Sequence, residues 1–234
     1  IRIRLQESPL FAQMKKEGKT STNPIKESFA NKENLKLVMI ALFGAAMGQG
    51  VIWYTGQFYA LSFLQKTMNI EFVQSNIIIA IALVLGTPFF IYFGSLSDRI
   101  GRKKIMLTGM LLAALAYYPI YIAMDNVGNL QMKQEQTELY KIESNSIKND
   151  AGELVIQSTR VHSYTDGSIL KETGDKKELT VSPTHIAWLA ILIFIQVFFV
   201  TMVYAPIDAF LVELFPTRIR YTSMSLPYNI GNGI

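Results

Sequence analysis

This sequence has little charge and no cysteine. Of its 234 residues, 17% are charged, against about 25% in a typical soluble domain. The absence of cysteine excludes disulfides and thiolate metal sites. Two histidines are too few to hold a metal without help from carboxylates, and the net charge of +4 is too unevenly distributed to indicate nucleic-acid binding. We therefore expect no metal, no cofactor and no nucleic-acid partner.

Four long stretches contain no charged side chain. Each has 20 or more residues, and a helix needs roughly 20 apolar residues to cross a bilayer. A soluble protein would have to bury four such helices on every side. We predict an all-α polytopic membrane protein with a fifth helix beginning near Tyr221, and the four predicted spans cover residues 37–64, 72–97, 105–124 and 185–207.

The segments between these stretches alternate in their charge balance. Residues 1–36 hold eight basic and four acidic residues, and the turn at 97–104 holds four and one. Residues 125–184 instead hold seven basic and ten acidic residues. Because cytoplasmic loops are enriched in Lys and Arg, we expect the first two segments in the cytoplasm and the third outside. The predicted regions are a cytoplasmic loop (1–36), three spans (37–124), a periplasmic or extracellular insert (125–184), and a span, a cytoplasmic turn and the start of another helix (185–234).

The insert at 125–184 has the pattern of β-structure. Residues 154–164 alternate apolar and polar side chains, and residues 165–168 read Thr-Asp-Gly-Ser, a typical hairpin turn. Residues 149–152 form a second turn signal. We expect a small β-meander outside the membrane, and the alternative is a structured lid or an inserted loop that binds no ligand of its own. Residues 25–34, before the first span, are expected to form an amphipathic helix at the membrane surface.

The turn between the second and third spans contains two glycines, an aspartate and a run of cations. Gly94 and Gly101 permit close backbone approach and positive φ. Asp98 can pair with an arginine or cap a helix. A turn that only sets the topology would explain the cations, which are Arg99, Arg102, Lys103 and Lys104, but not the glycines and the aspartate.

A second charged element ends the fourth span. Glu213 lies on the same predicted side as the basic turn, so we expect it to join an ion-pair cluster with Arg99, Arg102 and Lys103. Pro216 ends or kinks the helix, and Arg218 and Arg220 follow it. The alternative is a helix end that carries interfacial charges.

These elements resemble signatures of the major facilitator superfamily. Residues 94–104 resemble its loop motif between the second and third and between the eighth and ninth helices. Residues 213–220 resemble the glutamate–six residues–arginine element after the tenth helix of sugar and organic-acid porters. Residues 4–11 resemble the Glu-Ser-Pro element of the central loop. The resemblance implies that the chain is an internal piece of a longer protein, namely helices seven to eleven, whose partner is the amino-terminal half.

A closer resemblance is to the metabolite:proton symporter family, through residues 51–59 and 213–229. Its members carry organic acids, betaines and similar metabolites across bacterial inner membranes. The long insert departs from that family. The resemblance implies a secondary transporter that works by alternating access in the bilayer, coupled to protons, with a conformational gate made of Gly94, Asp98, Arg99, Gly101, Arg102, Lys103, Glu213, Arg218 and Arg220.

Polar and aromatic side chains in the first span are candidates for a substrate pathway, because polar groups in a span tend to face a cavity. They are Trp53, Tyr54, Gln57 and Tyr59. Helix packing and the membrane interface also favour small and aromatic residues, so both readings remain open. Asp208 is a candidate protonation site or a boundary residue in water.

Three functional classes remain. The chain is a transporter, or a transporter-like sensor whose insert binds an external ligand, or a membrane enzyme. The last is disfavoured because no Ser–His–Asp grouping, metal cluster or phosphate loop lies at one membrane depth. His162 and His185 are expected in solvated or interfacial positions.

Overall fold

The computed structural model describes residues 9–18, 21–148 and 154–233. The chain is mostly helical, with four long apolar helices and one small antiparallel sheet, so the predicted fold class is confirmed. Residues 4–8 of the Glu-Ser-Pro element and the turn at 149–152 lie outside the described residues. The four helices long and apolar enough to cross a membrane are Lys32–Thr67, α6 (Phe72–Ile100), α7 (Arg102–Gly128) and α8 (Pro183–Leu214).

The first of these helices changes its winding several times. Its α-helical parts are α3 (Lys32–Met39), α4 (Met47–Trp53) and α5 (Ala60–Ser62), and π-helical turns at Ile40–Ala46, Tyr54–Tyr59 and Phe63–Thr67 join and follow them. π-Helical turns are rare in proteins, and many of those that do occur lie at functional sites. The turn at Tyr54–Tyr59 includes three of the four predicted pathway residues.

The amphipathic segment expected before the first span is divided between α2 (Pro24–Ala30) and the start of that span. The single amphipathic helix expected over residues 25–34 is interrupted at Asn31, between α2 and α3. Asn31 has extended backbone angles, and its side chain accepts a hydrogen bond from the Glu33 amide at 2.9 Å. An Asn at this position caps a new helix, so the cap at Asn31 starts the first span five residues before the charge-free stretch.

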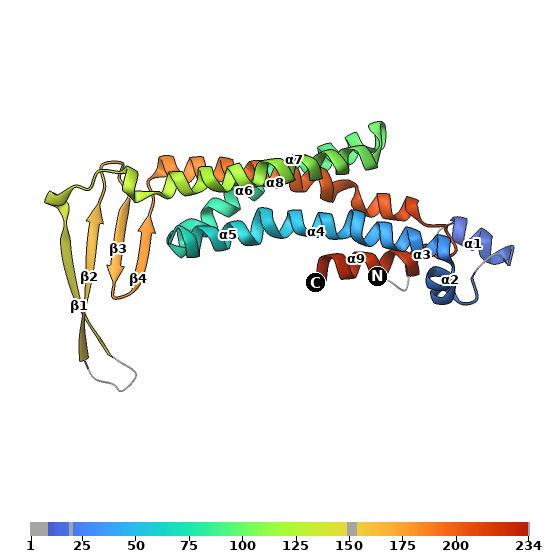
Figure 1. Ribbon diagram of the computed structural model, residues 1–234, viewed down its shortest axis with the longest axis horizontal. Coiled ribbons are helices and arrows are strands. Elements are labelled where there is room, and N and C mark those ends of the chain that lie inside the picture. The colour runs from blue at the N-terminus through green and yellow to red at the C-terminus, as the bar shows by residue number, and fades with distance from the viewer. Residues whose placement is uncertain (1–8, 19–20, 149–153, 234) are drawn as a thin grey trace. The chain divides into compact units, whose positions relative to one another are not determined.

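The chain divides into two compact units. The first consists of Ile1–Ile52, Phe89–Leu111 and Val200–Ile234. In it, α2, α3 and α9 (Arg220–Gly233) lie side by side (Figure 1). A Cβ on Gly50 would meet the carbonyl oxygen of Gly231, and one on Gly231 would lie 2.6 Å from the Ala46 Cβ. Glycine is therefore required for the close approach of α9 to the first span. The core of this unit includes Val38, Met106, Ile207, Leu211 and Phe215.

The second unit, Trp53–Pro88 and Leu112–Phe199, contains the sheet. Its strands are β1 (Lys141–Lys148), β2 (Leu154–Ser163), β3 (Ile169–Thr173) and β4 (Lys176–Thr180). They pair antiparallel in chain order, as Figure 1 shows. The β-rich insert expected from the alternating sequence pattern is therefore confirmed.

The free side of β4 pairs with the connection that precedes α6. The Leu179 amide donates to the Asn69 carbonyl at 2.7 Å, and the Glu71 amide donates to the Leu179 carbonyl at 3.0 Å. Leu179 is buried, and Asn69 adopts a φ of 55°, a left-handed conformation that Asn tolerates better than most residues. These bonds join β4 directly to the connection between the first span and α6.

Candidate functional site

Arg102 is the centre of the first polar site. Gly101, with a φ of 101°, separates α6 from α7, and Arg102 is the first residue of α7. Its guanidinium bonds Asp98 Oδ1 through Nη2 at 2.8 Å and through Nε at 3.2 Å. Its Nη1 pairs with Glu213 Oε1 and also donates to the Ala209 carbonyl at 3.3 Å. We call Asp98, Arg102 and Glu213 the Arg102 cluster; it joins the ends of α6, α7 and α8.

The two carboxylates of this cluster are open to solvent. The side chain of Arg102 is 23% exposed, whereas those of Asp98 and Glu213 are 61% and 64% exposed. Ion pairs with such exposure contribute typically about 0.2–1 kcal/mol. The cluster therefore contributes only weakly to the stability of this arrangement.

The structure places the other predicted gate cations elsewhere. Arg99 and Lys103 are exposed and form no ion pair among the described residues. Arg218 pairs with Glu27 of α2 at 2.5 Å, and Arg220 Nε donates to the Phe215 carbonyl at 3.2 Å. We expected several cations in this cluster. Of the predicted gate cations, only Arg102 belongs to it, because the other side chains lie away from Glu213 or bind other groups.

Among the described residues Gly94 shows neither a close approach nor a positive φ, and its part in the gate stays a prediction. Gly94 lies inside α6, has no positive φ, and a Cβ there would have no described atom within 4 Å. Gly101 does have the expected positive φ, although a Cβ there also meets nothing. The two glycines thus differ, and backbone conformation constrains the second of them.

One contact in this unit had no signal in the sequence. Ser28 of α2 and Ser223 of α9 are both fully buried, and the Ser223 hydroxyl donates to the Ser28 Oγ at 2.7 Å. The Ser28 hydroxyl donates in turn to the Pro24 carbonyl at 2.6 Å. With the Glu27–Arg218 ion pair, these bonds attach α2 to the start of α9.

The predicted pathway residues lie at the end of α4 and on the π-helical turn that follows it. Tyr54 and Tyr59 are 48% and 54% exposed, whereas Trp53 and Gln57 are half-buried. The Tyr121 hydroxyl of α7 donates to the Thr55 carbonyl at 2.7 Å, and the rings of Tyr59 and Tyr121 are 5.2 Å apart. Tyr121 therefore supports the π-helical turn, a role that the sequence did not indicate.

Asp208 is exposed within α8 and forms no ion pair among the described residues. It lies about one turn before Glu213. Its exposure agrees with a boundary residue in contact with water, and its use as a protonation site stays a prediction.

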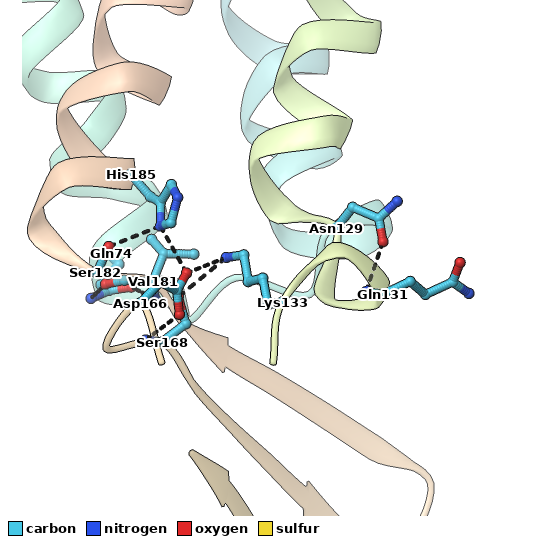
Figure 2. A network of polar contacts seen from close by, with 9 residues as sticks. All are labelled: Gln74, Asn129, Gln131, Lys133, Asp166, Ser168, Val181, Ser182 and His185. Atoms are coloured by element: carbon cyan, nitrogen blue, oxygen red, sulfur yellow. Dashed lines mark hydrogen bonds and ion pairs between the residues drawn. The ribbon is translucent and has the colours of Figure 1, made fainter. Parts of the chain in front are cut away.

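A second polar site fastens the insert to the helices (Figure 2). Lys133 Nζ lies 2.7 Å from Asp166 Oδ2, and His185 Nδ1 of α8 lies 3.2 Å from the same oxygen. The Ser168 amide and hydroxyl donate to Asp166 at 3.0 and 2.9 Å. We call Lys133, Asp166, Ser168 and His185 the insert network. It links the β2–β3 turn to the segment after α7 and to the start of α8.

The electrostatics of this network favour ionised Asp166. Burial by itself raises the pKa of Asp166, but hydrogen bonds from Lys133 and Ser168 outweigh it and hold the pKa below its ordinary value of 3.8. The Lys133 side chain is only 9% exposed, and buried charges are retained where they are paired. The ion pair therefore neutralises an ammonium group that is nearly out of contact with solvent.

An amide adds a third attachment. Gln74 of α6 accepts from the Val181 amide at 2.8 Å and donates to the Val181 carbonyl at 3.2 Å. The side chain of Gln74 thus satisfies both the N–H and the C=O of Val181. His162, expected in a solvated or interfacial position, lies 2.7 Å from Glu135 Oε1 through its Nδ1.

Comparison with known proteins gives a family for this arrangement. A family model described as the Major Facilitator Superfamily matches residues 6–130, more than half of the chain. A protein named "Putative proline/betaine transporter" from Staphylococcus aureus strain MSSA476 is 25% identical over 112 residues, which is 47% of this chain and 23% of that protein. The protein of the same name from strain COL is 24% identical over the same shares.

The matched part of the chain thus spans about a quarter of the length of these relatives. No solved structure gives a significant match. The family is one of transporters, in agreement with the expectation that the chain is not an enzyme. The family match extends over the first span, α6, the basic turn and α7. The chain belongs to the Major Facilitator Superfamily.

Proposed function

We propose that the chain is the second half of a secondary transporter that moves a small organic metabolite across the bacterial inner membrane. The observation that carries the proposal is the Arg102 cluster, in which Arg102 holds carboxylates from the ends of α6 and α8. The amino-terminal half of the same transporter is the partner with which this half would form the central site.

Alternating access requires contacts that form in one state and break in another. The Arg102 cluster would close the cytoplasmic side, as the excess of basic residues in 1–36 and 97–104 supports. Its exposed carboxylates keep each ion pair weak. Weak ion pairs suit a gate, because coupling free energies of about 1–3 kcal/mol are enough to shift a conformational equilibrium.

The substrate class follows from what the spans contain. Within the four charge-free stretches there is no Lys or Arg to hold an anion and no carboxylate to hold a cation. This composition supports a zwitterionic or neutral metabolite unless the other half supplies the charge, in which case organic acids also fit. The similarity to two proteins named for proline and betaine transport agrees with a zwitterion.

Tyr54, Gln57 and Tyr59 would line the path on the π-helical turn, where aromatic and amide groups can contact a small solute. We also propose proton coupling, which the resemblance to the metabolite:proton symporters supports. Asp208 is exposed near the same end of α8 as the Arg102 cluster, so we place the main proton-carrying group in the amino-terminal half.

The test is proton-gradient-dependent uptake into vesicles that hold the full-length protein, over a panel of betaines, dicarboxylates and sugars. Gradient-dependent uptake of one class, reduced by up to about fivefold in Asp98→Asn, would support both the transport and the gate. Uptake that continues after the proton gradient is collapsed would remove the symport part.

A second candidate is a transporter-like sensor, favoured by one observation: the insert network attaches a folded sheet to α8. A ligand bound by such an insert would act directly on a span. Deletion of residues 130–182 separates the two functions, because a transporter retains uptake and a sensor loses its response.

A further inference from the structure

A cavity of about 320 Å³ lies at the base of the insert, where the sheet meets the ends of the first span and α7. This volume falls at the small end of the roughly 300–1,000 Å³ found for ligand pockets. Three of the residues that line it, Leu170, Leu179 and Met68, are apolar and buried. The polar side chains that line it are Thr67, Asn69, Asp125, Asn129, Gln131 and Lys177.

Two of these side chains carry opposite charges. Asp125 is exposed in the last turn of α7 and forms no ion pair within the part of the chain that the structure describes. The negative end of a helix dipole disfavours a carboxylate, so Asp125 gains nothing from its own helix. Its carboxylate is therefore available to a positive group of a ligand.

Lys177 supplies the positive charge. Its Nζ lies 2.9 Å from Glu172 Oε1, and a hydrogen bond from Lys177 lowers the pKa of Glu172. An ammonium group has three hydrogens, so this contact leaves two for a ligand. Its side chain is 58% exposed, which keeps it open to solutes.

The polar walls are held in place by the backbone. Asn69, with its positive φ, lies where the chain leaves the first span, and its carbonyl is bonded to β4. Asn129 Oδ1 accepts from the Gln131 amide at 2.9 Å, which fixes the turn after α7 (Figure 2). The insert network continues from the same segment through Lys133. The cavity is therefore formed in advance, which reduces the entropic cost of binding.

We propose that this cavity is an external capture site for a small zwitterionic solute, with the cationic nitrogen toward Asp125 and the carboxylate toward Lys177. A simple anion would lie near the carboxylate of Asp125, and a simple cation would make no use of the two remaining hydrogens of Lys177, so a molecule with both charges fits best. The choice of a zwitterion rests on the proposed function, and the site itself rests on the cavity and its two charges.

Thiol protection tests the site directly. In the full-length protein without other cysteines, Gln131→Cys is labelled from outside in intact cells with a membrane-impermeant maleimide, with and without glycine betaine. At a concentration of about four times the Kd, the free fraction of the site falls about fivefold, and labelling should slow by the same factor. Choline and acetate, which each carry one of the two charges, should slow labelling much less at that concentration.

Matched variants assign the effect to the two charges. Asp125→Asn and Lys177→Gln should each abolish protection by glycine betaine, whereas Lys171→Gln, an exposed lysine on β3, should retain it. Labelling of Lys141→Cys on β1 should be unaffected by betaine. Absence of protection in the parent protein, equal protection by choline, or protection that survives in both charge variants would each overturn the proposal.

Uptake measured in parallel separates this proposal from the proposed function. Protection without uptake of any compound would leave the capture site and remove the transporter. Uptake of betaine without protection would leave the transporter and remove the capture site. If both hold, Asp125→Asn should raise the KM for uptake and leave the maximal rate nearly unchanged.

Discussion

Arg102, the first residue of α7, binds Glu213, the next-to-last residue of α8. The same guanidinium holds Asp98, one helical turn before it in the chain. A single cation thus connects the ends of three helices. Its planar fork of donors suits this geometry, which a lysine would not reproduce.

Breaking this contact should change transport by a modest factor. Glu213→Gln should reduce the initial uptake rate by up to about fivefold, because an exposed ion pair contributes at most about 1 kcal/mol. Arg102→Glu should be more damaging, since it places three carboxylates together. The exchange of charges in Arg102→Glu with Glu213→Arg should recover part of the rate. Glu33→Gln on α3 is the control, and an exchange variant no better than Arg102→Glu would argue against the pair.

The two glycines of the basic turn should respond differently to alanine. Gly101→Ala forces a left-handed conformation on a residue with a Cβ, at a cost of about 1–2 kcal/mol. Gly94→Ala replaces a helix-interior glycine that has open space around it, and alanine favours the helix. Thermal unfolding of the purified full-length protein should show a lowered midpoint for Gly101→Ala only. An equal loss in Gly94→Ala would indicate that a part of the protein outside the described residues packs against it.

Tyr121→Phe tests the support of the π-helical turn. The substitution keeps the ring contact with Tyr59 but removes the hydrogen bond to the Thr55 carbonyl. Loss of one such bond costs about 0.5–1.5 kcal/mol, so we expect the substrate affinity in uptake assays to fall about two- to tenfold. Tyr118→Phe, on a side chain that is 76% exposed, should leave uptake unchanged. The idea fails if the two variants behave alike.

The insert network should make the attachment of the sheet depend on pH. Because the pKa of Asp166 is lower in the folded protein than its ordinary value of 3.8, its contribution to stability is present above that value and is lost as the pH falls through the lowered pKa. The protection factors of the Leu179 and Glu71 amides, which correct the exchange rate for its intrinsic dependence on pH, should therefore fall in acid.

Asp166→Asn should lower the same protection factors at neutral pH, because it leaves the nearly buried Lys133 without its counter-charge. Asp175→Asn, on an exposed turn residue, is the matched control. Slow exchange at neutral pH in Asp166→Asn would show that the Gln74 and Leu179 bonds hold the sheet by themselves.

Much of the architecture was predictable from local patterns. Charge-free stretches of sufficient length predict the four long helices, because the interior of a bilayer admits few charged side chains whatever the order of the other residues. Alternation over residues 154–164, followed by a turn sequence at 165–168, predicts β2 and the turn to β3. The cap at Asn31 was also readable in principle, because an Asn before Lys32-Glu33 is a common helix start.

The partners of the charged and polar side chains were decided by the tertiary structure. Four cations lie in the basic turn, and nothing in their spacing distinguishes Arg102 as the one that binds Glu213. Arg218 turns instead to Glu27, and Ser28 meets Ser223 only because α2 packs against α9. Lys133 and Gln74 are ordinary polar residues in the sequence, yet they attach the insert. The helical pattern is local and follows from residue composition, whereas the choice of partner depends on how segments far apart in the chain approach one another.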